Sequence, residues 1–289
     1  MNIGVIGQGF VGSALREGLR SFHNVLTYDI DENKCNSTHD EICIKSDIIF
    51  LCLPTPMRKD GSCDIRILEE ELSHTDWRLE CALLNKERKK KPIVVIKSTM
   101  PPGSTKKLFD NLKFKKMELC FSPEFLTEAN SFEDFKNQTR IIIGGPRPAT
   151  GTVKSMFRKA FPTIPIVKTG TKTAEMVKYF TNCFLATKVT FANQMYEICE
   201  ASGIDYDKVC EYALHDERIG KSHLAVPGPD GDRGFGGHCF PKDLSAMINF
   251  ANNFKIDSAF LKQVEASNTK YRGNNRDWEK MKGRAVSDD

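Results

Sequence analysis

Short apolar segments alternate with longer amphipathic segments through the first half of the chain. Ile48–Leu53 is typical of the short segments, because a run of four to six mostly apolar residues fits a strand that is buried on both faces. Ile65–Leu84 is typical of the longer segments, with isoleucine and leucine side chains at helical spacing. Buried strands that alternate with helices indicate an α/β fold with a parallel, doubly wound sheet. The predicted strands are Ile3–Ile6, Val25–Asp29, Ile48–Leu53, Ile93–Lys97, Met117–Phe121, Arg140–Ile143 and Ile164–Lys168.

The pattern changes after Gly170, where the sequence becomes predominantly helical. Thr171–Ser202 lacks proline and glycine and repeats apolar residues at helical spacing, which predicts a single helix of 32 residues. Residues 216–238 contain six glycines and two prolines and form a loop too long to be a plain connection. The polar tail, residues 273–289, is expected to fray. Further helices are predicted at Asp205–His215, Phe240–Asn253 and Asp257–Lys270.

Composition narrows the class of protein. The 289 residues are 40% hydrophobic and 28% charged, which is typical of a globular protein and excludes a disordered chain. No apolar run reaches the ~18 residues of a membrane span and no secretory leader is recognisable, so we expect a cytoplasmic protein. The ten cysteines show neither a C-x-x-C pair nor regular spacing, so neither disulfides nor a metal ion are predicted. A net charge of +4 is too small to indicate nucleic-acid binding.

The first chemical signal is the glycine-rich segment Gly7–Gly12, which follows a predicted strand and opens a helical pattern. Its G-x-G-x-x-G spacing is typical of a dinucleotide site: the first glycine makes the turn, Gly9 admits the pyrophosphate, and the third lets the helix pack on the strand. The first helical turn, which begins with Phe10 and Val11, then offers its N–H groups to the phosphates. Asp29 follows Gly7 by 22 residues, where its carboxylate can bind the ribose hydroxyls and repel a 2′-phosphate. NAD is therefore expected rather than NADP.

The second chemical signal is the segment Gly234–Asp243 (GFGGHCFPKD), which joins a glycine-rich loop to a helical pattern. Cys239 lies at the predicted start of the helix, where the helix dipole favours the thiolate, the nucleophilic form of cysteine. Asp243 follows about one helical turn later, so its carboxylate and the sulfur can share one face of the helix. This combination predicts a nucleophilic cysteine rather than a small core residue.

These two segments and five others, in the same order, resemble the motifs of the nucleotide-sugar dehydrogenases, the UDP-glucose/GDP-mannose dehydrogenase family. The resemblance covers almost the whole chain. It implies a Rossmann-type NAD-binding domain over residues 1–170, and then a long central helix with an all-α dimerisation and catalytic domain over residues 171–272. The five further matching segments are Pro54–Pro56, Lys97–Gly103, Ser122–Glu128, Glu175–Asn182 and Asp216–Gly220.

The resemblance implies that a primary alcohol is oxidised to a carboxylate in two NAD-dependent steps. Cys239 would capture the intermediate aldehyde as a thiohemiacetal, and the second oxidation would leave a thioester that water hydrolyses. Lys178 and Asn182, four residues apart on the long helix, would stabilise the oxyanion-like intermediates. Asp243 with Thr99 would position the water that cleaves the thioester.

The remaining roles also follow from the resemblance. Glu124 would transfer protons during thioester hydrolysis. The implied cofactor-binding residues are Gly7, Gly9, Phe10, Val11, Gly12 and Asp29, with Lys34 on the adenosine side and Thr55, Thr99 and Glu128 on the nicotinamide side. The implied substrate-binding residues are Glu124, Phe125, Leu126, Lys178, Asn182, Arg218, Phe235, Gly236 and Gly237.

The resemblance further implies a partner and a substrate class. In the family, an arginine at the position of Arg218 reaches the sugar site of the neighbouring subunit, which implies a homodimer built on the long helix. UDP-glucose, oxidised to UDP-glucuronate, is the favoured substrate. GDP-mannose is the alternative nucleotide sugar, and the other alternative is a non-catalytic NAD- or sugar-binding protein that pairs with a full-length enzyme.

Two features depart from the family. The 25 residues between Asp29 and Thr55 leave little room for the extra strand and helix that members usually place there. The 289 residues also do not include the third, UDP-binding domain that usually follows. We therefore expect a short form of the enzyme.

Overall fold

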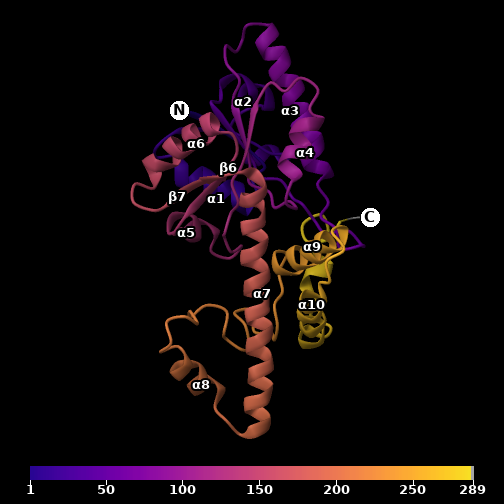
Figure 1. Cartoon of the computed structure of the whole chain (residues 1–289). Helices are drawn as coiled ribbons and strands as arrows, with labels where there is room; N and C mark the ends of the chain where they lie inside the picture. The colour runs from indigo at the N-terminus through magenta and orange to yellow at the C-terminus, as the bar shows by residue number, and fades with distance from the viewer. Residues whose placement is uncertain (288–289) are drawn as a thin grey trace. The chain divides into compact units, whose positions relative to one another are not determined.

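The computed structural model describes residues 1–287, which form two compact units. Unit 1 comprises Met1–Thr55 and Ile65–Lys178, and unit 2 comprises Pro56–Asp64 and the chain from Tyr179 onward. The division falls within one continuous helix, α7 (Thr171–Ser202), which is drawn as the long ribbon of Figure 1. Each unit has an apolar core of its own.

Unit 1 is built on a sheet that has seven strands within the described residues (Figure 1). Their spatial order is β2-β1-β3-β4-β5-β6-β7, and all neighbouring pairs are parallel except β5 and β6, which are antiparallel. Every strand predicted from the sequence is confirmed, with ends that differ by one or two residues. The strands are β1 (Asn2–Ile6), β2 (Asn24–Tyr28), β3 (Ile48–Leu51), β4 (Ile93–Ile96), β5 (Glu118–Phe121), β6 (Ile141–Gly144) and β7 (Ile166–Thr169).

Successive side chains of each strand face opposite sides of the sheet, as buried strands require. In β1, Ile3 and Val5 belong to one core and Ile6 belongs to the other. Helices cover both sides, which gives the Rossmann-type α/β architecture predicted from the sequence. One side is covered by α1 (Phe10–Leu19), α5 (Ser131–Lys136) and α6 (Arg147–Ala160), and the other by α2 (His39–Lys45), α3 (Arg66–Leu84) and α4 (Ser104–Asn111).

The short connection between β2 and β3 explains the strand order. In place of the strand and helix usual in the family it contains the 3-10 helix η1 (Glu32–Lys34) and α2, a helix of seven residues. A Rossmann sheet of order 3-2-1-4-5 that loses its third strand has the observed order β2-β1-β3-β4-β5. The crossover direction reverses between β1 and β3, and open α/β sheets bind ligands at the carboxyl ends of strands that meet at such a point.

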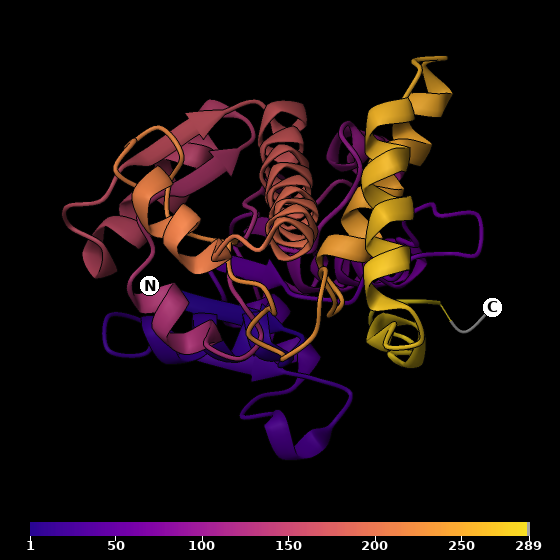
Figure 2. The ribbon, with the colours of Figure 1, turned by 90° about the horizontal axis from the view of Figure 1, so that it is seen from below.

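Unit 2 is helical. α7 has the predicted 32 residues, and it is followed by α8 (Tyr206–Ala213), α9 (Phe240–Asn253) and α10 (Ala259–Arg272). α9 contacts α10 (Figure 2). Apolar side chains of α7, α9 and α10 form the core of the unit, among them Cys183, Ala186, Leu244, Ile248 and Val264. Within residues 1–287, no helix combines the length and the hydropathy that a membrane span requires.

The expectation that the polar C-terminal segment frays is wrong for the described residues. Residues 277–280 form the 3-10 helix η2 (Asp277–Lys280), in which Trp278 is 7% exposed. Val286 pairs with Met57, which belongs to the same unit. The guanidinium of Arg272 donates to Asp277 Oδ1 at 3.1 Å and anchors the start of the segment. Burial of the tryptophan and this ion pair outweigh the polar composition on which the expectation rested.

Candidate active site

The glycine-rich loop follows β1 and opens α1, as a dinucleotide site requires. Gly7 has a φ of 89°, and a Cβ there would lie 2.4 Å from the carbonyl oxygen of Cys52. A Cβ on Gly12 would lie 1.9 Å from the carbonyl oxygen of Gly7, so that position has no room for a side chain. Gly9 is the N-cap residue, and a Cβ there would have nothing within 4 Å. No side chain caps the helix. Its first residue, Phe10, packs against the apolar core on one side of the sheet. The N-terminus of α1 thus has no side-chain cap, and the open space at Gly9 lets a phosphate approach it.

Asp29 stands directly after β2, at the same edge of the sheet as the glycine-rich loop. Its carboxylate accepts hydrogen bonds from the backbone N–H groups of Gln8, at 2.5 Å, and Asp31, at 3.0 Å. These bonds fix the carboxylate beside the loop, where a Rossmann-type site holds the adenosine ribose. Lys34, in η1, is exposed and forms an ion pair with Asp31 at 3.2 Å.

Thr55 and Thr99 connect the segments that follow β3 and β4. The hydroxyl of Thr55 donates to the carbonyl oxygen of Thr99 at 2.8 Å, and both residues are buried. The N–H of Leu53 likewise donates to the hydroxyl of Ser98 at 2.9 Å. Because parallel strands present their carboxyl ends at one edge of the sheet, both threonines lie at the edge that carries the glycine-rich loop.

A buried ion pair joins the loop after β5 to α7. Lys178 Nζ donates to Glu124 Oε1 at 2.9 Å and to the carbonyl oxygen of Glu124 at 2.9 Å. The N–H of Leu126 donates to the other carboxylate oxygen at 2.6 Å. Burial alone would raise the pKa of Glu124, but the charge of Lys178 and these hydrogen bonds lower it below its ordinary value. Glu124 is therefore a carboxylate at neutral pH and can accept a proton.

Lys97 is a second buried cation beside this pair. Its Nζ donates to the carbonyl oxygen of Pro123 at 3.1 Å. Burial lowers the pKa of Lys97 to about 8, and the charge of Lys178 acts in the same direction while that of Glu124 opposes it. Lys97 lies in one of the segments that match the family, but the sequence alone assigned it no role.

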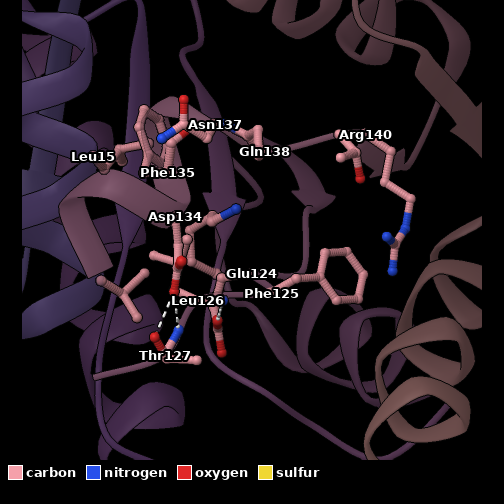
Figure 3. A pocket seen from close by; sticks show the side chains of 13 residues that line it. Leu15, Glu124, Phe125, Leu126, Thr127, Asp134, Phe135, Asn137, Gln138 and Arg140 are labelled. Atoms are coloured by element: carbon pink, nitrogen blue, oxygen red, sulfur yellow. Dashed lines mark hydrogen bonds between the residues drawn. The ribbon is translucent and has the colours of Figure 1, made fainter. Parts of the chain in front are cut away.

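The loop after β5 also lines a pocket of unit 1 (Figure 3). Glu124–Thr127 form one wall, and Val11 of α1 and residues of α5 contribute others. The guanidinium of Arg140 lies over the ring of Phe125, 4.2 Å from its centroid, so a cation and an aromatic ring are among the groups that line the pocket. Glu128, on the same loop, is exposed.

Glu175 fixes the first turns of α7 to α4. Its buried carboxylate accepts hydrogen bonds from the N–H groups of Gly103, at 2.5 Å, and Thr105, at 2.7 Å, and from the Thr105 hydroxyl. These donors lie at the N-terminus of α4, where the helix dipole favours a negative charge. The contact holds α7 in the register that brings Lys178, three residues later, to Glu124.

In unit 2 a second buried network surrounds Asp243. Asn182 Nδ2 donates to Asp243 Oδ2 at 2.5 Å, and Lys242 Nζ donates to Asp243 Oδ1 at 2.6 Å. Burial alone would lower the pKa of Lys242, but the charge of Asp243 raises it above its ordinary value, with smaller contributions from nearby thiols that include Cys239. Cys239 is the N-cap residue of α9, and its carbonyl oxygen accepts the N–H of Asp243 at 3.0 Å. Cys239 and Asp243 therefore share the first turn of this helix.

The loop before Cys239 is held by two buried asparagines. Asn193 of α7 accepts the N–H of Gly234 at 3.1 Å. Asn268 of α10 accepts the N–H of Phe235 at 2.7 Å and donates to its carbonyl oxygen at 2.9 Å. The backbone of the loop is thus bonded to two helices of unit 2.

An arginine and an aspartate hold the next two glycines. Asp277 accepts the N–H of Gly237 at 3.0 Å and is bonded in turn to Arg272, a buried residue that also pairs with Asp230 at 2.6 Å. A Cβ on Gly236 would lie 2.5 Å from the Arg272 guanidinium, so a side chain there would have to displace the ion pair of Arg272 and Asp277. Gly237 has a φ of 67°, which favours glycine on conformational grounds.

Arg218 lies in the loop after α8, outside these networks. Its side chain is 89% exposed and pairs with Asp216 at 2.5 Å. With Gly9, Lys34 and Glu128 it is one of four predicted site residues that are exposed in this single chain.

The structure therefore gathers most of the predicted residues into a network in each unit and adds residues that the sequence alone did not reveal. One feature of the sequence could have revealed these residues. Each is a polar residue at a position that the spacing of the neighbouring apolar residues predicts to be buried. They are Lys97, Glu175, Asn193, Lys242, Asn268 and Arg272.

Two family models match the chain. Residues 36–161 match the NAD binding domain of the UDP-glucose/GDP-mannose dehydrogenase family, and residues 172–270 match the central domain of the same family. The first match lies mainly in unit 1 and the second mainly in unit 2. Together they cover more than half of the chain.

Individual relatives agree with the family models. The chain is 31% identical to the UDP-glucose 6-dehydrogenase of Rickettsia typhi, over 95% of this chain and 68% of that protein. It is 32% identical to the UDP-glucose 6-dehydrogenase YwqF of Bacillus subtilis, over 91% of this chain and 65% of that protein. A solved UDP-glucose dehydrogenase from the hyperthermophilic archaeon Pyrobaculum islandicum is similar in fold, with a TM-score of 0.80, 27% identity, and coverage of 93% of this chain and 68% of that one. The chain thus spans about two thirds of the length of these relatives.

Proposed function

This chain belongs to the UDP-glucose/GDP-mannose dehydrogenase family, and we propose that it oxidises the primary alcohol of a nucleotide sugar, UDP-glucose, to a carboxylate. The observation that carries the proposal is the buried network of Asn182, Lys242 and Asp243 at the helix turn that begins with Cys239. Burying an ammonium and a carboxylate costs free energy of desolvation, and clusters of this kind concentrate at reactive centres. The names of the relatives favour UDP-glucose as the sugar nucleotide.

The residues of unit 1 fit NAD. The uncapped N-terminus of α1 and the open space at Gly9 would accommodate the pyrophosphate, and the Asp29 carboxylate would bind the ribose hydroxyls and disfavour NADP. When bound, NAD accepts a hydride in each of the two oxidations. The other proposed contacts are Gly7, Phe10, Val11 and Gly12 at the pyrophosphate, Lys34 on the adenosine side, and Thr55, Thr99 and Glu128 on the nicotinamide side.

Cys239 is the proposed nucleophile. Its thiolate would add to the aldehyde carbon to form a thiohemiacetal, and oxidation of that adduct would leave a thioester, which water cleaves to release the carboxylate and the thiol. The ammonium of Lys242, held charged by Asp243, favours the thiolate at Cys239. None of the ten cysteines forms a disulfide in the structure, which fits the cytoplasm, where we place the protein.

Polar groups of both networks would stabilise the charged intermediates. Lys178 and Asn182 would donate to the oxygen that gains negative charge in each addition step. Glu124, which is ionised at neutral pH, would take a proton from the water that attacks the thioester, and Asp243 with Thr99 would orient that water. The sugar nucleotide itself would contact Glu124, Phe125, Leu126, Phe235, Gly236 and Gly237.

We also propose that two copies of the chain associate through α7. One stripe of this helix exposes large apolar side chains, and the rings of Phe180 and Phe184 stack on one another with centroids 6.5 Å apart. A stable dimer buries on the order of 2,000 Å² of surface, and this stripe would form the apolar centre of such an interface. Arg218 would then contact the sugar in the site of the partner subunit. The exposed residues are Met176, Phe180, Phe184, Phe191 and Ile198.

Formation of NADH by the purified chain tests the proposed reaction. UDP-glucose with NAD should yield two NADH per sugar consumed, with UDP-glucuronate as the product, and GDP-mannose should yield much less. Light scattering of the same sample should report a mass near twice 32.6 kDa. NAD binding without NADH formation from any nucleotide sugar would contradict the proposal and indicate a non-catalytic binding protein.

A further inference from the structure

Three side chains that the proposed oxidation does not use form a cluster where α2 meets α3 in unit 1. His39 is the first residue of α2, and Glu71 and His74 are three residues apart on α3. One nitrogen or carboxylate oxygen from each residue lies within 4.8 Å of those from the other two. His39 is buried, Glu71 is half-buried and His74 is exposed, so the cluster is open to solvent at one end.

We propose that His39, Glu71 and His74 bind a divalent transition-metal ion, with zinc the best match to the ligands. Two imidazoles and one carboxylate are a zinc ligand set that leaves the fourth tetrahedral position to water. With bonds of about 2.1 Å, tetrahedral ligand atoms lie about 3.4 Å apart. The ligand atoms of the cluster lie at comparable distances: His39 Nε2 is 2.7 Å from Glu71 Oε1, and all three ligand atoms lie within 4.8 Å of one another. Rotation of the exposed His74 side chain would bring one ring nitrogen to the ion and close the site.

Neighbouring groups orient these side chains in the manner of the outer partners of metal ligands. The hydroxyl of Thr75 donates to Glu71 Oε1 at 2.8 Å, and Cys43 Sγ lies 3.7 Å from His39 Nδ1. The rings of His39 and His74 stack with centroids 4.5 Å apart. The stack places the His74 ring beside the pair of His39 and Glu71, and the ring has to turn out of the stack to point a nitrogen at the ion.

Metal binding would replace the proton between His39 Nε2 and Glu71 Oε1. A neutral imidazole nitrogen and a carboxylate oxygen are the forms that bind zinc. The proton would therefore leave to solvent or move to His39 Nδ1, where the sulfur of Cys43 can accept its hydrogen bond.

Arg78 is the group that competes with the ion. Its Nε donates to His74 Nε2 at 3.3 Å, and its guanidinium pairs with Asp40 at 3.1 Å, which balances part of its charge. The ion would displace Arg78 from the imidazole or bind the other ring nitrogen. Arg78→Gln is therefore expected to strengthen metal binding.

The position of the cluster indicates what the ion would do. α2 lies in the short connection between β2 and β3, where it replaces the longer segment usual in the family. An ion bound by His39 of α2 and two residues of α3 would cross-link this connection to the helix that covers the sheet. Because the ion would bind the folded chain and not the unfolded chain, it would raise the free energy of unfolding.

Cobalt(II) is a suitable probe, because its absorption reports ligand type and it quenches nearby fluorescence. The ring of Trp77 stacks on that of His74 with centroids 6.4 Å apart, whereas the other tryptophan, Trp278, is buried in unit 2. One equivalent of Co²⁺ added to the reduced, full chain should quench Trp77, and Zn²⁺ should reverse the effect. The near-ultraviolet spectrum should lack the sulfur-to-cobalt charge-transfer bands that binding to cysteine would produce.

Single variants distinguish this cluster from other groups. His74→Ala should weaken Co²⁺ binding at least about tenfold and abolish the rise of a few degrees in Tm that Zn²⁺ produces. His215→Ala, which alters an exposed histidine in unit 2, should leave both unchanged. His74 is exposed, so its loss should not prevent folding. Equal Co²⁺ affinity in both variants, or charge-transfer bands from sulfur, would overturn the proposal.

Discussion

Unit 1 and unit 2 place their polar networks by different physical means. In unit 1, Asp29, Thr55 and Thr99 follow neighbouring parallel strands, so the geometry of the sheet collects them at one edge. In unit 2, the segment before Cys239 is a glycine-rich loop with no regular structure of its own. Asn193, Asn268 and other buried polar residues of the surrounding segments hold that loop through hydrogen bonds to its backbone.

The difference determines how each network should respond to substitution. A site at the edge of a parallel sheet depends on apolar packing that many residues share, and loss of one polar contact changes ligand affinity while leaving the backbone in place. A loop held by a few buried polar groups loses its conformation with any one of them, because the partners are left unsatisfied. Substitutions in unit 2 are therefore expected to reduce turnover without reducing NAD affinity.

The largest expected effect is that of Cys239→Ser on turnover. A serine hydroxyl is a poor nucleophile at neutral pH and its ester hydrolyses slowly, so the rate of UDP-glucuronate formation should fall by at least about three orders of magnitude. NAD affinity, measured by calorimetry, should remain as in the wild type because its proposed contacts lie in unit 1. Cys81→Ser, at a half-exposed position of α3, is the matched control and should retain full activity.

The next effect concerns the pH dependence of stability in unit 1. Lys97 has a pKa of about 8 in the folded chain and an ordinary value of 10.5 when unfolded, so the unfolded chain binds more protons between these values. Stability contributed through Lys97 should therefore rise as the pH increases from about 8 to about 10.5, by about 3 kcal/mol in total. Urea unfolding of Lys97→Met should lack this rise, and identical pH profiles would refute the shift.

Arg272→Met should destabilise unit 2 by about 2 kcal/mol. A fully buried ion pair would cost about 3–5 kcal/mol when broken, but the partners Asp230 and Asp277 are 43% and 40% exposed and their charges are screened. Turnover should fall by more than the loss of folded protein explains, because Gly237 loses its hydrogen bond to the Asp277 carboxylate that Arg272 positions. Arg20→Met, in an exposed ion pair of unit 1, is the control; equal losses of NAD affinity and turnover in Arg272→Met would contradict the comparison.

The smallest expected effect is that of Asp29→Asn on the choice of cofactor. Loss of the negative charge removes repulsion of a 2′-phosphate and weakens the ribose contact, so the preference for NAD over NADP should decrease about tenfold. Calorimetric titration with both cofactors measures it directly. Asp31→Asn is the neighbouring control, and an unchanged preference in Asp29→Asn would remove that residue from the cofactor site.

Periodicity in the sequence was sufficient to predict the seven strands, α7 and α9, because each of these segments contains apolar residues at the spacing of a strand or a helix. It was insufficient for the segment after Gly273, whose order depends on contacts of Trp278 and Arg272 that local composition does not reveal. The site followed the same rule. Sequence motifs suggested Glu124 and Asn182 as candidate site residues, whereas Asn193 and Asn268 act through hydrogen bonds to residues at least 33 positions away, which no local motif reveals. The cluster of His39 with Glu71 and His74 likewise joins helices that only the folded sheet brings together.

The most direct test of the proposed covalent chemistry is the intact mass of the protein, quenched with acid while it turns over UDP-glucose and NAD. We predict a fraction of the chain that carries one UDP-glucuronyl group, located on Cys239 by peptide mapping and absent when NAD is omitted. Cys239→Ser should show either no acid product or a trapped sugar ester at residue 239. Formation of UDP-glucuronate at the wild-type rate by Cys239→Ser, with no adduct on either protein, would contradict the assignment of Cys239 as the nucleophile.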